Sequence, residues 1–459
     1  MTKETSSEID DENHPQGQSI GVQASEREVL YAYIASQLLR ENTFKTLRDT
    51  DEVLCYSDGM YHFNGETYIA ELVESAMGKR GRDGLVTSRF VDEIVGHIRR
   101  KTYIDRQELN SKPNLLNLEN GILNLDNFKL YRHDKRFLST IRIPIQFNPN
   151  AKCPLINKFF NEIVKLEHVP ILYEIPAWCL DTNSPIQVFI LLLGEGANGK
   201  STYLELLRRF LGKQNCCAIP VQALSRRFNL ATMYGKLANI YADLGPGALW
   251  DTSAVKLLTG GDTVQAEEKF KRPFTFRSTA KLIFSANTPP KIYEDTSAIW
   301  RRVLALPFPN QFMGEKEDKS LLSKLTTPGE LSGFLNMVVV SLKTLRDKGE
   351  FSYAPSLDTV RDHYLVFSDP VQVFLEEVCY IHPEKQISKE DLYQEFKKFC
   401  RQNKVPSYTK TKLGRELSKR KQFRTQGVDW RGLTLRQLVS EEEIEKEREG
   451  KGVFVNFSS

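Results

Sequence analysis

The residues with the clearest chemical signature form a glycine-rich run near the middle of the chain. The apolar run Val188 to Leu193 precedes it, and Tyr203 to Leu207 follows it with the pattern of a helix. The spacing fits Gly-x-x-x-x-Gly-Lys-Ser/Thr, in which glycines let backbone N–H groups turn towards an anion at the start of a helix. The predicted nucleotide-binding residues are Gly194, Glu195, Gly196, Ala197, Asn198, Gly199, Lys200, Ser201 and Thr202.

Two of these residues have distinct expected roles. Lys200 is placed to reach the β- and γ-phosphates of a nucleotide, and Ser201 is placed to bind Mg²⁺. The alternative is a glycine-rich turn between a strand and a helix that binds nothing. Because strand, loop and helix occur in the required order, the sequence favours a phosphate-binding loop.

Two later apolar runs also end on polar side chains. Leu237 to Asp243 ends on a carboxylate, and Ala280 to Asn287 ends on an amide shortly before Pro289. An acid at the end of a neighbouring strand would hold Mg²⁺ together with Ser201. Asn287 would orient the attacking water or contact the γ-phosphate. The alternatives are a carboxylate that caps the next turn and a turn residue before a proline.

Arg301 and Arg302 lie just before another predicted strand, Val303 to Phe308. A guanidinium can stabilise the charge that develops in phosphoryl transfer, often from a neighbouring subunit. A solvated pair or a carboxylate partner is the more common situation for two arginines. Only the presence of the glycine-rich loop favours a catalytic role for this pair.

Basic residues suggest contacts with nucleic-acid phosphates at two places. A loop or hairpin after Thr259-Gly-Gly-Asp262 carries Phe270, which could stack on a base, among positive charges. A second concentration occurs near the C-terminus, in an expected helix over 409–421. In both places, a charged face turned towards solvent is the alternative. The candidate DNA-binding residues are Lys269, Lys271, Arg272, Lys410, Lys412, Arg415 and Lys419.

Composition narrows the class of protein. The chain has 459 residues and a net charge of +4, which is too small by itself to indicate nucleic-acid binding. Seven cysteines without regular spacing are typical of a reducing compartment. No apolar run approaches the roughly 20 residues of a membrane span, and the first residues are polar. We therefore expect a soluble, cytoplasmic protein that does not enter a membrane.

Alternating strands and helices predict an α/β core with a largely parallel sheet, whose ligands bind at the carboxyl ends of the strands. We expect hairpins at Asp58-Gly59 and Asn120-Gly121, and helices over Phe159 to Leu172 and around Trp178. A helix-helix-hairpin pattern near the C-terminus is typical of a winged helix. The expected segments are a disordered acidic tail (1–24), a mixed α/β domain (25–160), an ATPase domain (161–348), a winged-helix domain (365–439) and a charged tail (440–459).

These residues resemble the superfamily 3 helicases, specifically the helicase half of the primase-helicases of phages, plasmids and large DNA viruses. Ala298-Ile-Trp-Arg-Arg302 is similar to the segment with the family's arginine finger. The other similar motifs are Leu193 to Thr202 (Walker A), Asn239 to Leu244 (Walker B), Leu258 to Asp262 with Glu267 to Lys271 (B′), Lys281 to Asn287 (motif C), and Tyr56 to Tyr61, Asn120-Gly121 and Phe147 to Pro154 (the preceding domain).

The resemblance implies an AAA+-type ATPase that forms a homo-hexameric ring, uses ATP and Mg²⁺, and translocates on single-stranded or forked DNA. It also implies ATP sites between subunits, the B′ hairpin in the channel, and a separate primase or polymerase as a partner. We expect no primer synthesis, since neither the acidic tail nor the short mixed domain has room for a primase. An origin-melting initiator and a winged-helix protein with an ATP-dependent assembly switch remain alternatives.

One departure from the family concerns the general base. Many members carry a second acid after the Walker B aspartate, whereas here Leu244 follows Asp243. The residue that would activate water is therefore unassigned, with Glu267 or Glu268 only a guess.

Overall fold

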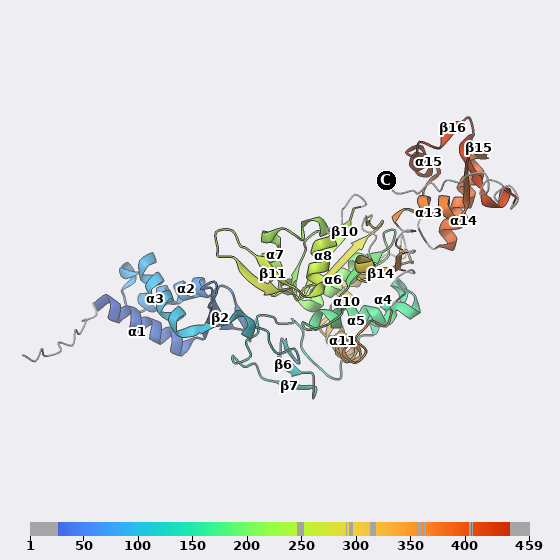
Figure 1. Cartoon of the computed structure of the whole chain (residues 1–459). Coiled ribbons are helices and arrows are strands. Elements are labelled where there is room, and N and C mark those ends of the chain that lie inside the picture. The colour runs from blue at the N-terminus through green and yellow to red at the C-terminus, as the bar shows by residue number, and fades with distance from the viewer. Residues whose placement is uncertain are drawn as a thin grey trace, which may run out of the picture. The chain divides into compact units, whose positions relative to one another are not determined.

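The structure is a computed structural model (Figure 1). It describes residues 26–245, 252–290, 292, 297–312, 318–353, 355, 360–361, 364, 366, 368–403, 405 and 407–440. The expected disordered tail over 1–24 and the charged tail from 441 onwards lie outside the described residues. The described residues fall into two compact units, the first within 1–56 and 62–104 and the second within 57–61 and 105–459.

The first unit packs helices α1, α2 and α3 against strands β1, β2 and β4, and β3, most of which lies in 57–61, completes the small sheet of order β3-β2-β1-β4. Strand β1 is antiparallel to β2 and parallel to β4. The expected hairpin is confirmed: Asp58 (φ 48°) and Gly59 (φ 80°) form the turn between β2 and β3. The core includes Ile34, Ile69 and Ile94. The elements are α1 (Glu26–Glu41), β1 (Phe44–Leu47), β2 (Val53–Ser57), β3 (Met60–His62), α2 (Gly65–Gly78), η1 (Asp83–Leu85), α3 (Ser88–Thr102) and β4 (Tyr103–Ile104).

The segment after β4 belongs to the second unit, so the boundary differs from the expected one at residue 160. Strands β5, β6 and β7 form an antiparallel sheet, and the expected hairpin is present, with Glu119 and Asn120 in its turn and Gly121 opening β6. Leu116, Leu118 and Leu123 from this sheet share a hydrophobic core with the helices that follow. Shared apolar burial therefore joins these strands to the larger unit. Their bounds are η2 (Arg106–Glu108), β5 (Leu115–Leu118), β6 (Gly121–Asn124) and β7 (Lys129–Tyr131).

The expected helix over Phe159 to Leu172 is wrong in its bounds, because two helices meet there. Helix α4 (Pro154–Ile163) begins with a proline, and α5 (Val169–Leu180) follows the short turn η3 (Leu166–His168). The buried carboxylate of Glu330 accepts hydrogen bonds from the first N–H groups of α4, at Leu155 (3.2 Å) and Ile156 (3.1 Å). Glu330 belongs to α11 (Pro328–Lys348), which packs against both helices.

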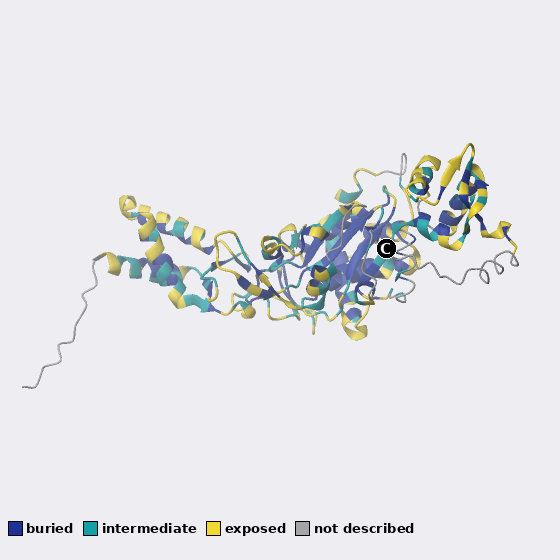
Figure 2. Cartoon of the chain, turned by 45° about the horizontal axis from the view of Figure 1, so that its top comes forward, coloured by how far each residue is buried: buried dark blue, intermediate teal, exposed yellow. Residues whose placement is uncertain are grey.

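A parallel sheet of order β14-β8-β13-β10-β9 forms the centre of the second unit (Figure 1). Each neighbouring pair of strands in this sheet is parallel, which confirms the expected α/β core. The five residues of β8 are all buried, and Figure 2 shows the strands of this sheet in the buried colour. The strands are β8 (Phe189–Leu193), β9 (Cys216–Cys217), β10 (Ala238–Leu244), β13 (Lys281–Ala286) and β14 (Val303–Pro307).

Helices and a hairpin connect these strands. Helix α6 buries its apolar face through Leu204, Leu207 and Leu211, and Gly212 (φ 90°) ends it as expected. An antiparallel hairpin, β11 and β12, stands between α8 and β13. The bounds are α6 (Lys200–Leu211), η4 (Lys213–Asn215), η5 (Val221–Ala223), α7 (Arg227–Met233), α8 (Thr252–Gly260), β11 (Thr263–Ala266), β12 (Phe274–Arg277), α9 (Ser297–Trp300) and α10 (Leu321–Leu325).

The C-terminal segment has its own hydrophobic core, which includes Phe374, Phe396 and Leu433. Two helices and a hairpin occur as expected, and α13 and β15, which the sequence did not indicate, precede them. Strand β17 pairs with both β15 and β16. The elements are α13 (Pro370–Glu377), β15 (Cys379–Ser388), α14 (Lys389–Gln402), α15 (Lys410–Ser418), β16 (Arg424–Gln426), β17 (Asp429–Leu435) and η7 (Arg436–Leu438).

Candidate functional site

Three polar strand ends meet at one edge of the central sheet. Strand β13 lies between β8 and β10, with Ala286 opposite Leu193 on one side and opposite Leu244 on the other. The residues after β8 and β13 are Gly194 and Asn287, and Asp243 is next to last in β10. The sheet therefore brings together the glycine loop (residues 194–199), Asn287 and Asp243, as the sequence predicted.

The geometry of the glycine loop requires glycine at two of its positions. A Cβ on Gly194 would lie 1.9 Å from Nδ2 of Asn198 and 2.7 Å from the carbonyl oxygen of Phe308. Gly199 has φ 85°, and a Cβ there would lie 2.5 Å from Cγ2 of Ile163. The loop thus curls tightly enough to exclude side chains at both ends before α6 begins at Lys200.

Lys200 is buried where the strand ends converge. Its Nζ donates to the carbonyl oxygen of Gly194 (2.5 Å), to Oδ1 of Asn198 (3.0 Å) and to Oδ1 of Asn287 (3.2 Å). Burial lowers the pKa of this amine to about 8, although the nearby charge of Asp243 acts in the opposite direction. The ammonium group is held by neutral oxygens at a position from which it could contact a phosphate.

Asn198 is a second buried residue of the loop. Besides accepting from Lys200, its side chain donates to the carbonyl oxygen of Phe308 at 3.3 Å. Two further contacts join the loop to the residues after β14: Phe312 N–H donates to the carbonyl of Ala197 (2.6 Å), and Gln311 donates to Glu195 (3.3 Å). The conformation of the loop therefore depends on a segment more than 100 residues later in the chain.

The candidate magnesium ligands are available to solvent. Ser201 and Asp243 are exposed, whereas the neighbouring Thr202 is partly buried. Strand β10 continues through Asp243 to Leu244 instead of ending on the carboxylate, and Asp243 has φ 60° at an irregularity in the pairing with β13. The backbone N–H of Asp243 donates to the buried Oγ of Ser285 at 3.1 Å.

Ser285 is a residue that sequence reasoning missed. The sequence offers only one indication of its role, namely a hydroxyl-bearing residue two positions before Asn287. Its hydrogen-bond partner, Asp243, is 42 residues away in the chain. An L-residue in the left-handed region is uncommon and is sustained by surrounding contacts. Ser285 thus helps to fix the turn that directs the Asp243 carboxylate.

Arg301 and Arg302 are adjacent in the sequence but differ in burial and in hydrogen-bond partners. Arg302 is buried, and it donates to Oγ1 of Thr259 (3.1 Å) and to the carbonyl oxygen of Ala298 (2.7 Å). Arg301 is exposed. Because the Arg302 guanidinium is engaged inside its own chain, the geometry favours Arg301 over Arg302 for the predicted catalytic role. Only Arg301 is available to a neighbouring molecule.

The two carboxylates considered as a general base lie in the loop between β11 and β12. Glu267 forms an ion pair with Arg227 (3.2 Å), and Glu268 forms one with Lys271 (2.6 Å). Within the described residues, neither carboxylate is hydrogen-bonded to Lys200, Asn287 or Asp243, so the geometry does not favour either of them as the general base.

The tip of this hairpin presents an aromatic side chain to solvent. Phe270 is 93% exposed and has φ 66°. The ammonium of Lys269 lies 4.9 Å from the centre of its ring. Lys271 and Arg272 are also exposed. An exposed aromatic ring beside cations can stack on a base while the cations contact phosphates.

The candidate basic residues on α15 and beside it differ in their partners. Lys410 and Lys419 form ion pairs with Glu390 (2.5 Å) and Glu416 (2.7 Å). Lys412 lies 3.5 Å above the ring of Tyr408, and neither it nor Arg415 has a carboxylate partner among the described residues. All four are exposed. Of these four candidates, Lys412 and Arg415 are therefore the two whose charge is not already neutralised by a carboxylate.

Two family models each match part of the chain. Residues 192–302 match a family of unknown function (DUF5906), and residues 79–165 match the family described as D5 N terminal like. A protein of Acanthamoeba polyphaga mimivirus named "Putative helicase L207/L206" is 28% identical over 255 residues. That match covers 49% of this chain and 26% of the relative.

Among solved structures, the C-terminal region of NrS-1 in its apo form is similar at 12% identity with a TM-score of 0.46, covering 90% of this chain and 100% of that one. Another apo form of that region has a TM-score of 0.47 at 11% identity.

Within the described residues, no helix combines the length and apolar character that crossing a membrane requires.

Proposed function

We propose that this chain is an ATP-dependent DNA helicase of the superfamily 3, AAA+-type class, acting in the replication of a virus, phage or plasmid. The observation that carries the proposal is the position of the Lys200 ammonium. It makes contacts of 2.5–3.2 Å with oxygens from both ends of the glycine loop and from Asn287. An amine in this position, at the start of a helix, is suited to binding the terminal phosphates of ATP.

The positions of the site residues suggest a role for each of them. The loop amides and Lys200 would bind the phosphates, and Ser201 and Asp243 would hold Mg²⁺. Asn287 would sense whether the γ-phosphate is present, because it already accepts a hydrogen bond from Lys200. Arg301 would act on the ATP of a neighbouring subunit in a hexameric ring, and Phe270 with its basic neighbours would contact single-stranded DNA. The C-terminal segment, proposed to be a winged helix, would add a further DNA contact.

The similarity to a viral protein with a helicase name supports the proposal, although the match spans about a quarter of that protein. An initiator that melts an origin would use the same ATP site. Displacement of strands from forked duplexes of increasing length separates the two possibilities, since an initiator would open only short duplexes.

The central test compares Lys200→Ala with Lys213→Ala, a substitution of an exposed lysine beyond the end of α6. We expect Lys200→Ala to abolish DNA-stimulated ATP hydrolysis and unwinding, and Lys213→Ala to retain both. DNA-stimulated hydrolysis by Lys200→Ala at the wild-type rate would refute the assignment of the nucleotide site.

A further inference from the structure

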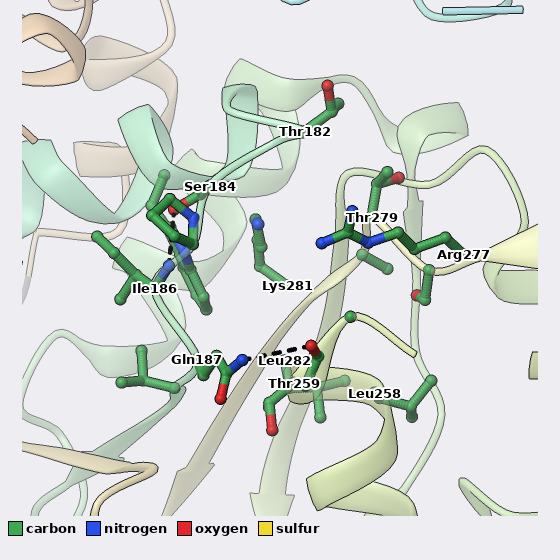
Figure 3. Close-up of a pocket in the computed structure, with 17 residues that line it drawn as sticks. Thr182, Ser184, Ile186, Gln187, Leu258, Thr259, Arg277, Thr279, Lys281 and Leu282 are labelled. Atoms are coloured by element: carbon green, nitrogen blue, oxygen red, sulfur yellow. Dashed lines mark hydrogen bonds between the residues drawn. The ribbon is translucent and has the colours of Figure 1, made fainter. Parts of the chain in front are cut away.

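A second polar pocket lies at the opposite end of the central sheet from the glycine loop. Its walls come from the 182–188 connection, the end of α8 with Gly260-Gly261, and the turn 278–280 between β12 and β13 (Figure 3). Lys281, which begins β13, lines this pocket, whereas Asn287 at the other end of β13 contacts Lys200. At about 3.3 Å per residue, the six steps from Lys281 to Asn287 place the two sites roughly 20 Å apart.

Two cations point into this pocket. Figure 3 shows the side chains of Arg277 and Lys281 extending into the same space from the end of β12 and the start of β13. Neither forms a hydrogen bond or ion pair with a carboxylate in the described part of the chain. The lining residues, all of which the structure describes, include no aspartate or glutamate. The Lys281 ammonium lies 5.1 Å from the centre of the Trp178 ring.

The surroundings of Lys281 disfavour its charge. Desolvation lowers its pKa to about 8, and the neighbouring Arg277 acts in the same direction. Cys179 and Asp181 act in the opposite direction. Asp181, however, is itself paired with Arg346 at 2.9 Å. Two cations in a partly desolvated space without a lining carboxylate would be stabilised by an added anion.

Two of the lining residues also carry a buried polar atom without a hydrogen-bond partner in the described part of the chain. Trp178 Nε1 and Ser278 Oγ are buried without a hydrogen-bond partner among the described residues. The Trp178 side chain is 2% exposed. Buried donors normally find a partner, so each such atom indicates an unmet interaction. Both atoms can donate to an anion, and they belong to residues that line the same pocket as Arg277 and Lys281.

The size of the pocket limits its ligand. The cavity has a volume of about 50 Å³, room for roughly four waters, whereas pockets for drug-sized ligands measure roughly 300–1,000 Å³. A nucleoside is too large. One phosphate group, with acceptor oxygens on every side, matches both the space and the donors.

We propose that the pocket formed by Arg277, Lys281, Trp178 and Ser278 binds one phosphate group of a single-stranded DNA backbone. The phosphate chemistry follows from the pocket alone, and the strand as its source rests on the proposed helicase function. The pocket lies at the root of the β11–β12 hairpin, whose tip carries Phe270. Its wall residue Thr259 accepts the hydrogen bond from Arg302, next to Arg301. A strand held there would contact the hairpin and lie close to the arginine segment.

The test uses Lys281→Met, which keeps a long apolar side chain against Trp178, and Arg277→Gln, singly and together, in the full chain. Lys213→Met serves as the control for an exposed lysine. Binding of a fluorescent dT oligonucleotide is measured across a salt series. We expect the double variant to bind about 10-fold more weakly, with a salt slope smaller by about 0.7, the value for one phosphate contact on a single strand. MgADP binding and DNA-independent ATP hydrolysis should stay within about twofold of the wild type.

A second arm examines the phosphate chemistry without DNA. In a Lys200→Ala background, where the glycine loop is impaired, we expect inorganic phosphate to raise the melting temperature. Adding Lys281→Met and Arg277→Gln should remove that increase. A loss of the phosphate effect with unchanged dT binding would overturn the DNA strand as the source and leave a site for a free anion. No change in either measurement would overturn the pocket. Failure of wild-type dT binding would count against the helicase function, while the phosphate arm would still decide the pocket.

Discussion

At the scale of single residues, the electrostatic state of Lys200 gives a test that does not depend on turnover. Its pKa of about 8 in the free protein is lower than that of an ordinary lysine, because burial disfavours the charged form. Bound phosphates would favour the ammonium and raise the pKa. At pH 8 about half of the free protein lacks this proton, so ATP binding should take up about half a proton per site.

Titration calorimetry in buffers of different ionisation enthalpy measures this uptake. We expect it to decrease towards pH 7, where Lys200 is already charged, and to increase towards pH 9. Lys200→Arg provides the control, because arginine stays protonated throughout this range. Equal proton uptake by Lys200→Arg and the wild type would show that another group takes up the proton.

The two adjacent arginines give a second prediction at this scale. Arg301 is exposed and Arg302 is bound to Thr259 and Ala298. Arg301→Ala should lower kcat by about 10³-fold or more without lowering the melting temperature, as expected for a group that acts on the transition state. Arg302→Ala should destabilise the fold by about 1–3 kcal/mol, because buried acceptors lose a charged donor.

Mixed assemblies test whether Arg301 acts between subunits. Mixing Arg301→Ala chains with Lys200→Ala chains should restore part of the activity, because some interfaces then combine an intact loop with an intact arginine. If no mixing ratio restores hydrolysis, Arg301 does not act in trans. Arg302→Ala with wild-type stability and reduced kcat would reverse the assignment of the two residues.

At the scale of elements, the β11–β12 hairpin carries the clearest prediction. Because Phe270 is 93% exposed, Phe270→Ala should leave the free energy of unfolding within about 0.5 kcal/mol of the wild type. Loss of base stacking should weaken single-strand binding by about 1–3 kcal/mol and reduce DNA stimulation of hydrolysis. Fluorescence anisotropy with dT oligonucleotides measures the binding.

A matched control is Phe128→Ala, another exposed aromatic residue, in the turn between β6 and β7. It should change neither DNA binding nor hydrolysis. A Phe270→Ala protein that binds dT as tightly as the wild type would show that the hairpin tip is only a solvated turn.

These elements also show which features were predictable. The glycine loop is local, since strand, loop and helix follow one another within about 25 residues, and apolar periodicity is sufficient to find them. The contact between Asn287 and Lys200 joins residues 87 positions apart and arises because β13 lies between β8 and β10. Strand order has no local sequence signal. The same limitation explains why Ser285 and the burial of Arg302 could not be anticipated.

At the scale of the whole chain, shared hydrophobic cores define the limits of the units better than the positions of prolines in the sequence do. The expected boundary at 160 follows Pro144 and Pro149, which suggest a connector. Leu116 and Ile143, however, belong to the same core as Leu204 of α6. The C-terminal segment behaves differently, because Phe374 and Leu433 belong to a separate core. Its removal should therefore leave the nucleotide site intact.

The last prediction concerns how this segment contributes to DNA binding. A chain ending at residue 365 should hydrolyse ATP without DNA at a rate within about twofold of the full chain. It should bind forked DNA more weakly, with a flatter salt dependence. Lys412→Gln with Arg415→Gln should reproduce much of this loss, since neither residue has a carboxylate partner among the described residues. Two lost contacts correspond to a slope change of about 1.8 on duplex DNA.

Lys410→Gln with Lys419→Gln provides a control that removes the same number of charges from the same region. Both lysines are already neutralised by Glu390 and Glu416, so their replacement should change the slope less. All the slopes are measured from binding isotherms on one forked substrate. The salt concentration is varied between roughly 50 and 200 mM, a range over which phosphate contacts change affinity strongly. Equal slopes for the two double variants would show that net charge alone governs the contact. An unchanged slope in the shortened chain would place these basic residues in solvent, away from DNA.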